Sequence, residues 1–166
     1  MNDNDVSSYY KEALVTDSFT VHNNFLNMLL KDGSALGMER HYCYFKDSKN
    51  ADLKRILGNG FLKRGKEGVF FLKEKLKTET DALFRGFIVS AMRQIFFRHK
   101  ETKQQIVDFI YVKMPEETYN ELLAIMIVVL QDLTKVKFGL KEDSCSGEIS
   151  GDIAKAKDKV LKKIKK

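Results

Sequence analysis

The sequence has 166 residues, of which 43% are hydrophobic and 31% charged, with one proline and no tryptophan. A chain of this length and apolar content folds most simply as one domain, and its composition argues against disordered, collagen-like and membrane proteins. Lys and Arg exceed Asp and Glu by 29 to 23, a net charge of +6, which keeps nucleic-acid binding open as a function.

The N-terminus does not predict a secretory signal, because residues 1–5 are acidic and polar instead of basic and then apolar. The longest apolar run, Leu122–Leu130, has nine residues, whereas a helix that crosses a bilayer needs about 20. Cys43 and Cys145 are too few and too far apart for a disulfide framework. We therefore expect a cytoplasmic protein with reduced thiols and no membrane span.

Apolar residues recur at helical spacing through most of the chain. The first clear helix is expected to end near Lys31, where Gly33 suits the position after a helix C-terminus. Two further helices are expected over residues 34–46 and about 51–57. The stretch Gly58-Asn59-Gly60 should then interrupt the helical pattern.

From Gly68 the spacing predicts a short helix followed by a longer one. Thr80 or Asp81 is suited to cap the start of the longer helix, and the basic residues 98–100 suit its C-terminal end. A second short helix follows over about residues 106–110.

Pro115 is expected to open a long helix that runs to about Leu133, because proline is favoured in the first turn. Within it, Leu122–Leu130 is apolar on all sides and could also form a buried strand. Its length and its start signals favour a helix at the centre of the domain.

An internal repeat emerges when the chain is aligned with itself so that Asp81 matches Pro115. This alignment superimposes two helix pairs, and the two matched residues are the expected helix starts. A short helix, a tight turn and a longer helix at a fixed period are typical of a helical solenoid, in which each hairpin buries its apolar face against the next. The matched apolar positions are Leu72 with Ile106, Leu76 with Ile110, Ile88 with Leu122, Ala91 with Ile125, Met92 with Met126, and Ile95 with Val129.

The longer helix of the first pair resembles the second helix of a HEAT-like repeat. The resemblance covers roughly residues 68–133 and departs in the second pair, where Pro115 replaces Asp81 and Tyr119 replaces Arg85. It implies an all-α fold, a short HEAT-like solenoid of stacked antiparallel helical hairpins, and no particular activity. The residues that carry it are Asp81-Ala82-Leu83-Phe84-Arg85, then Ile88, Ala91, Met92 and Ile95.

The C-terminal part differs in composition from the helical-repeat domain expected over residues 1–140. Residues 141–149 are polar and indicate a linker, and residues 150–166 predict a lysine-rich amphipathic helix. Because so short a helix is marginal alone, we expect it to dock as a cap on the last hairpin through its apolar stripe, Ile153, Ala156, Val160 and Ile164; a frayed helix and a membrane-surface helix are the alternatives. The apolar stripe has no aromatic residue, which weakens the membrane alternative.

No motif predicts catalysis, a cofactor or a metal. On a helix His41 and Cys43 would point about 200° apart, so they could not share a metal ion, and no second Cys/His pair occurs. The glycine-rich stretch 58–68 lacks the Gly-Lys-Ser/Thr ending of a phosphate-binding loop and does not follow a strand. We therefore do not expect an enzyme.

The leading hypothesis is a non-catalytic protein-binding module. Short chains low in proline and rich in Lys, Asn, Ile and Phe are similar to bacterial immunity proteins of contact-dependent or polymorphic toxin systems. That similarity implies a cognate toxin domain as the protein partner, blocked by a surface complementary in shape and charge; an adaptor with another protein partner is the less specific version. Solenoid geometry places the binding surface on the exposed side of the repeat helices, near Phe87, Ser90, Gln94, Asn120 and Glu121.

The alternative is a nucleic-acid-binding helical-repeat protein. Residues 151–166 carry seven lysines and two aspartates, so most of the net charge lies in the last helix and the remaining chain is nearly neutral. That distribution weakens the alternative without removing it. Its candidate contacts are Lys63, Arg64, Lys66, Arg93, Arg98, Lys100 and Lys103 in the repeats, and Lys155, Lys159, Lys162, Lys163 and Lys166 in the last helix.

Overall fold

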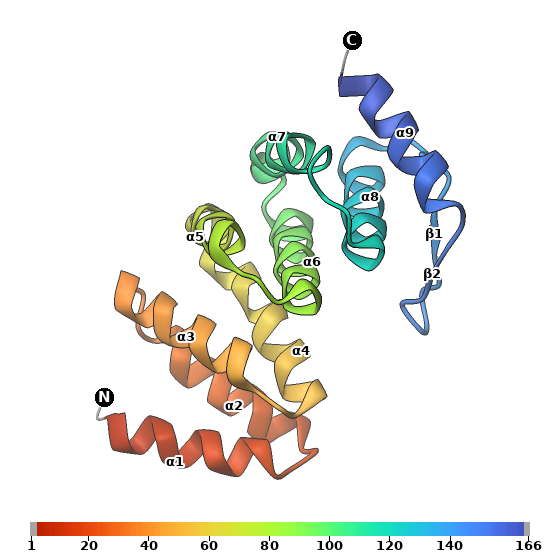
Figure 1. Cartoon of the computed structure of the whole chain (residues 1–166). Helices are drawn as coiled ribbons and strands as arrows, with labels where there is room; N and C mark the ends of the chain where they lie inside the picture. Colours follow the sequence, from red (N-terminus) through yellow and green to blue (C-terminus); the bar gives the residue numbers. More distant parts are fainter. Residues whose placement is uncertain (1–2, 165–166) are drawn as a thin grey trace.

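Helices make up most of the chain, so the fold is all-α, as the sequence predicts (Figure 1). The computed structural model describes residues 3–164, with side chains from residue 6 onward. The helices are α1 (Asp3–Leu14), α2 (Phe19–Leu30), α3 (Ala35–Asp47), α4 (Ala51–Gly60), α5 (Gly65–Thr78), α6 (Ala82–Arg98), α7 (Lys103–Lys113), α8 (Asn120–Thr134) and α9 (Ile153–Ile164). The short elements are the 3-10 turns η1 (Phe61–Arg64) and η2 (Lys100–Thr102) and the strands β1 (Lys141–Glu142) and β2 (Ile149–Ser150).

The helices follow one another along the molecule, from α1 at one end to α9 at the other (Figure 1). Helices α1, α3, α5 and α7 each pack on the helix that follows, and α2, α4, α6 and α8 also pack on one another in that order. A stack of helical hairpins would have such contacts. The interpretation as a HEAT-like solenoid stays a prediction.

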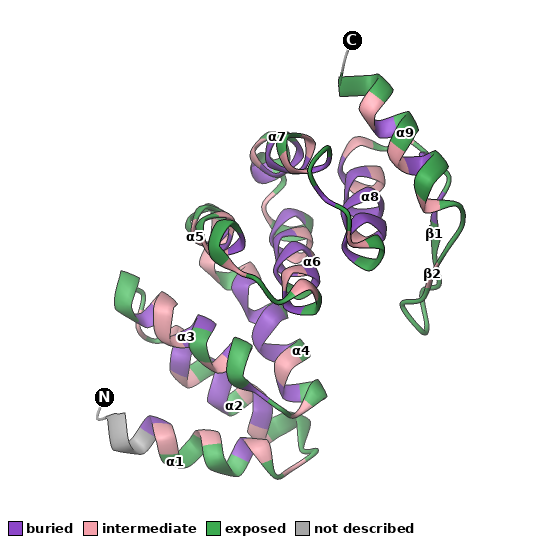
Figure 2. Cartoon of the chain, viewed as in Figure 1, coloured by how far each residue is buried: buried purple, intermediate pink, exposed green. Residues whose placement is uncertain are grey.

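Helices α6 and α8 supply the centre of the core (Figure 2). Ile88 and Ile95 of α6 and Ile127 and Leu130 of α8 have no exposed surface. Nine residues of α8 are buried, on every side of the helix. The helix expected for Leu122–Leu130 is therefore confirmed, and the strand alternative is wrong.

The predicted break at Gly58-Asn59-Gly60 is wrong, because these residues form the last turns of α4. A Cβ on Gly58 would lie 2.9 Å from the Phe45 ring, and one on Gly60 would overlap the side chain of Leu26. The two glycines therefore allow close helix packing. The chain leaves α4 through η1 and turns at Gly65, whose φ of +61° favours glycine.

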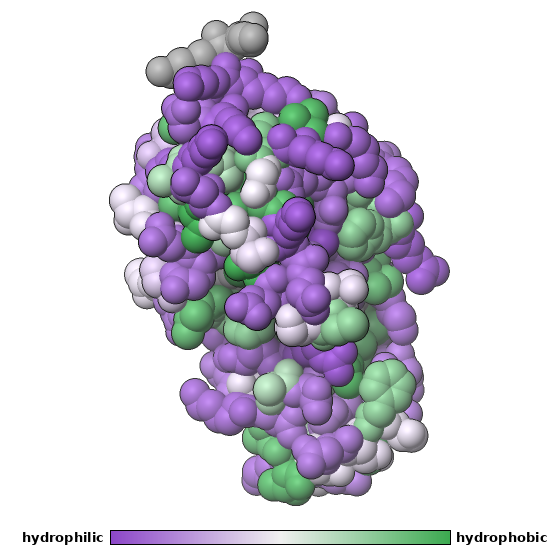
Figure 3. All heavy atoms as spheres, turned by 90° about the vertical axis from the view of Figure 1, so that its right-hand side faces the viewer, coloured by the Kyte–Doolittle hydropathy of each residue, from purple (hydrophilic) through white to green (hydrophobic). Residues whose placement is uncertain are grey.

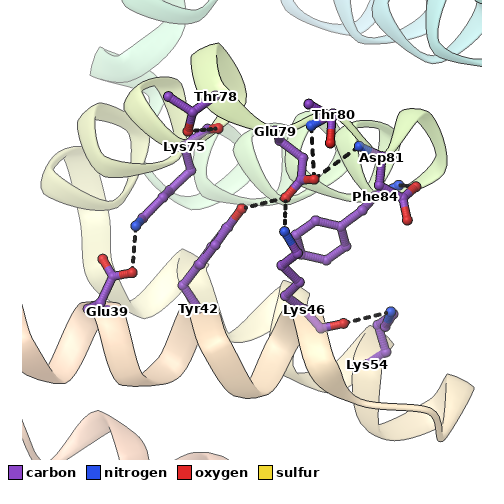
Figure 4. A network of polar contacts seen from close by, with 10 residues as sticks. All are labelled: Glu39, Tyr42, Lys46, Lys54, Lys75, Thr78, Glu79, Thr80, Asp81 and Phe84. Carbon is purple, nitrogen blue, oxygen red and sulfur yellow. Dashed lines mark hydrogen bonds and ion pairs between the residues drawn. The ribbon is translucent and has the colours of Figure 1, made fainter.

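The carboxylate of Glu79 organises the turn that precedes α6 (Figure 4). Its Oε1 accepts hydrogen bonds of 3.0 Å from the backbone N–H groups of Thr80 and Asp81. Its Oε2 accepts from the Tyr42 hydroxyl at 3.2 Å and from Lys46 Nζ at 2.7 Å. Burial alone would raise the pKa of Glu79, but the hydrogen bonds from Lys46 and Asp81 outweigh it and lower that pKa. The predicted cap at Asp81 is confirmed, because its side chain accepts from the first turn of α6.

A matching turn precedes α8, where Glu117 Oε1 accepts 3.0 Å hydrogen bonds from the N–H groups of Thr118 and Tyr119. Because this turn is extended, α8 begins at Asn120, and the prediction that Pro115 opens the helix is wrong. The turns make Glu117 the equivalent of Glu79, whereas the alignment predicted from the sequence would match Glu79 with Lys113. That alignment therefore places the start of the second long helix about one turn too early.

Arg85 connects α6 to the turn that precedes α8. Its Nη2 donates to Glu117 Oε2 at 2.5 Å, and the Glu117 side chain is only 5% exposed. Arg85 therefore pairs with a carboxylate from the segment between α7 and α8, outside its own helix.

The C-terminal segment is more ordered than a linker. Residues 141–149, expected to be a polar linker, contain β1 and the start of β2, which pair antiparallel. The last helix begins at Ile153, later than the predicted residue 150, because the Asp152 side chain caps it by accepting from Lys155 N at 2.9 Å. Helix α9 packs on α7 and α8; of its predicted apolar stripe, Ala156 and Val160 are buried, whereas Ile164 is 38% exposed.

None of the described helices has the length and apolar character needed to cross a membrane. The expected cytoplasmic location stays a prediction.

His41 gives the fold a predictable sensitivity to acid. The ring is buried and stacks on Phe61 at a centroid distance of 4.1 Å; Nε2 donates to the carbonyl oxygen of Leu57 at 2.9 Å, and Nδ1 has no partner. Burial is the main reason that the pKa of His41 falls from 6.5 to about 3. Between these values the unfolded chain binds a proton that the folded chain does not, so stability falls as the pH falls.

We expect His41 to contribute up to about 1.4 kcal/mol of destabilisation per pH unit within that window. Urea unfolding of the parent and of His41→Phe, which keeps the ring stack, at several pH values from about 4 to 7 measures the contribution. The free energy of unfolding of the variant should fall less steeply with acidification. Parallel slopes would contradict a buried neutral His41.

Candidate functional site

A groove of about 680 Å³ lies along α4 and α6 and reaches Gly147 in the turn between β1 and β2. Its apolar lining comes from Phe45 at the base, Ala51 of α4, and Phe87 and Ala91 of α6. Phe87 is 44% exposed, although aromatic side chains are usually among the more buried ones. Small side chains on both helices leave this ring accessible from the groove.

Three basic residues, Lys49, Lys54 and Arg55, line the same groove, and no acidic residue lines it. Arg55 forms an ion pair of 3.2 Å with Asp52, so its charge is partly neutralised. The groove is therefore apolar at its base and positively charged at the α4 side.

Lys54 is the most unusual of these cations. Its Nζ lies 5.3 Å from the ring centroid of Phe84 and 5.6 Å from that of Phe87, and donates to the carbonyl oxygen of Lys46 at 3.1 Å. Burial, reinforced by the charge of Lys49, lowers the pKa of Lys54. Among residues 6–164 no carboxylate lies within ion-pair distance of Lys54, although the charges of Asp81 and Asp47 act on it from farther away. It is a partly desolvated cation with N–H groups left to donate.

A second hollow, of about 270 Å³, lies where the start of α8 meets the hairpin formed by β1 and β2. Its lining includes Ala124 and Ile125 of α8 and Ile149 of β2, and it shares Gly147 with the groove. The two hollows therefore meet at the hairpin tip.

The five residues predicted as a binding surface are only partly brought together. Phe87 and Ser90 line the groove, and Asn120 and Glu121 line the second hollow. Gln94, one turn beyond Ser90, is half-buried and lines neither. The sequence reasoning missed Lys49, Lys54, Arg55 and Gly147, because their only signal is proximity to residues distant in the chain.

Arg93, a predicted nucleic-acid contact, is engaged in an internal ion-pair network instead. Its Nε donates to Asp132 of α8 at 2.5 Å, and Nη1 and Nη2 donate to the two carboxylate oxygens of Glu142 at 3.0 and 2.7 Å. These bonds raise the pKa of Arg93 although burial opposes them. The guanidinium fastens β1 to α6 and α8, so it is a wrong candidate for a phosphate contact.

Arg64 is also structural. Its guanidinium donates to the carbonyl oxygens of Leu29 at 3.1 Å and Asp32 at 2.6 Å, which lie at the C-terminal end of α2 and just beyond it. Burial lowers the pKa of Arg64. Lys63 donates to Asn27 at 3.1 Å, and Lys100 lies 4.2 Å from the Phe96 ring centroid. Of the nucleic-acid contacts predicted in the repeats, five are exposed: Lys63, Lys66, Arg98, Lys100 and Lys103.

The predicted C-terminal lysines Lys155, Lys159, Lys162 and Lys163 are exposed on α9. Figure 3 faces this side of the molecule, and the surface directly below the grey residues is mostly hydrophilic, with smaller hydrophobic patches further down. Lys166 lies outside the described residues.

Within residues 6–164, no group of three or more His, Cys, Asp or Glu side chains is placed to hold a metal ion. Comparisons of the chain with protein-family models, curated proteins and solved structures find no match. The site must therefore be interpreted from the chemistry of this chain's own residues.

Proposed function

We propose that the chain is a non-catalytic protein-binding module and that the groove along α4 and α6 is its binding surface. The observation that carries the proposal is the pairing of an accessible aromatic ring, Phe87, with a cation that lacks a carboxylate partner, Lys54. A few residues in well-packed, desolvated pockets supply most of the energy in protein interfaces, and aromatic side chains are enriched at such interfaces.

The charge of the groove defines the partner surface that it fits. A partner could insert an apolar side chain against Phe87 and place a carboxylate beside Lys54. That carboxylate would accept hydrogen bonds from the remaining N–H groups of the Lys54 ammonium. Such a contact is favourable where the cation is already partly desolvated. The partner surface is therefore acidic with an apolar anchor.

We further propose that the partner is a bacterial toxin domain and that the chain is its immunity protein. Support comes from the similarity of the sequence composition to such proteins. Neutralisation would follow from occlusion, as the groove and the neighbouring hairpin cover the active site of the toxin.

A growth assay tests this proposal. We expect the adjoining gene to encode a toxin domain, and that domain is expressed in bacteria with and without the chain. Growth should stop without the chain and recover with it. An adjoining gene that encodes no toxin, or growth that the chain does not restore, would contradict the immunity role.

A further inference from the structure

A second basic surface lies where the segment after α8 meets α9, away from the groove. Lys137, Lys159, Lys162 and Lys163 line a hollow of about 410 Å³, which we call the lysine hollow. Beside it, Lys135 and Lys141 line another hollow of about 410 Å³. The sequence reasoning included three of the four lysines of the lysine hollow and missed Lys137.

The docking of α9 produces this gathering of charge. Lys159, Lys162 and Lys163 are three and four residues apart and therefore share one face of the helix. Val160 follows Lys159 directly, about 100° further round the helix, and it is buried, which fixes the rotation of α9. Lys137 then approaches from the segment that follows α8.

Carboxylates neutralise little of this charge. Asp158 pairs with Lys162 at 2.6 Å. No carboxylate lines the lysine hollow, and Lys137, Lys159 and Lys163 form no ion pair with any carboxylate of residues 6–164. Cations held together in this way repel one another, and a bound polyanion would relieve that repulsion.

We propose that the lysine hollow binds the phosphate backbone of a nucleic acid without sequence preference. Lysines act as point charges toward phosphates, and a chain of phosphates can contact several of them at once. An anionic membrane is the less suitable ligand, because a helix that lies on a membrane needs an apolar face toward the lipid. In α9 that face is buried against α8, and Phe138, the aromatic residue of the hollow, is 3% exposed.

The test measures binding of the full chain to fluorescently labelled single-stranded and duplex DNA of about 20 nucleotides. Fluorescence anisotropy gives the affinity at salt concentrations from about 50 to 300 mM. The variant K137Q/K159Q/K162Q/K163Q removes the lysine hollow. The matched control K11Q/K31Q/K49Q/K77Q removes the same charge from exposed lysines that are not among the candidate nucleic-acid contacts. Circular dichroism of both confirms folding.

We expect the hollow variant to bind about tenfold or more weakly and its salt dependence to fall by about one unit of slope per lysine removed. The control should stay within about threefold of the parent. Three outcomes would overturn the proposal: a parent without salt-sensitive binding, equal losses in both variants, or tighter binding to phosphatidylserine vesicles through the same lysines. The hollow variant should still restore growth against the toxin, so this proposal and the proposed function fail separately.

Discussion

Replacing Glu117 with alanine is expected to lower the free energy of unfolding by about 3 kcal/mol. The substitution leaves Arg85 without its carboxylate and two backbone N–H groups, of Thr118 and Tyr119, without their acceptor. Breaking a buried ion pair by removing one partner costs about 3–5 kcal/mol. The lower end applies here because the Arg85 side chain is 23% exposed and stays partly hydrated.

Chemical denaturation of two further variants separates the contributions. Glu117→Gln keeps an oxygen for the backbone N–H groups but loses the charge, and should cost about 1–2 kcal/mol. Glu116→Ala changes an exposed neighbour and should cost less than about 0.5 kcal/mol. If Glu117→Ala is as stable as Glu116→Ala, the turn before α8 does not depend on this carboxylate.

Local signals explain the parts of the fold that the sequence predicts correctly. The cap at Asp81 depends on a backbone N–H three residues away, and the helices follow from apolar spacing within one element. The apolar stripe predicted for the last helix contains Ala156 and Val160, which are buried, and Ile164, which is exposed. Each of these features is decided by neighbours in the chain.

The errors arise where a distant residue decides the outcome. Gly58 and Gly60 have the composition of a helix break, but their packing against Phe45 and Leu26 keeps them helical. Pro115 favours a helix start, and the hydrogen bonds of Glu117 delay that start.

One signal of the turn spacing was present in the sequence. The dipeptide Glu-Thr occurs at positions 79–80 and 117–118, where it marks the two equivalent turns, and also at positions 101–102, where it lies in η2. The apolar matches that favoured the alignment of Asp81 with Pro115 obscured it.

The groove could be predicted only in part for the same reason. Phe87 and Ser90 were expected on an exposed helix face, which is a local inference. Lys54 becomes a binding candidate only because α4 places it beside the rings of α6. The approach of Gly147 depends on the docked hairpin.

Reversing one charge in the groove is expected to have the largest effect on partner binding. Lys54→Glu places a carboxylate where the partner presents its own, so attraction becomes repulsion in a partly desolvated site. Loss of a hydrogen-bonded charge contact at an interface costs about 2–5 kcal/mol, which is at least about thirtyfold in Kd. Phe87→Ser should weaken binding by a similar factor, because it removes the apolar anchor.

The control is Phe70→Ser, which removes an aromatic ring of similar exposure, 61% against 44%, from α5 and outside the groove. All three variants should keep the melting temperature of the parent within a few degrees, about the shift that a loss of 1 kcal/mol produces.

The most direct test of the groove along α4 and α6 as the binding surface is isothermal titration. The toxin domain that we expect the adjoining gene to encode is titrated into the parent and these three variants. We expect Lys54→Glu and Phe87→Ser to raise the Kd for the toxin domain by at least about thirtyfold, and Phe70→Ser to leave it within about threefold of the parent. Tight, unchanged binding by Lys54→Glu and Phe87→Ser would show that the groove along α4 and α6 is not the binding surface.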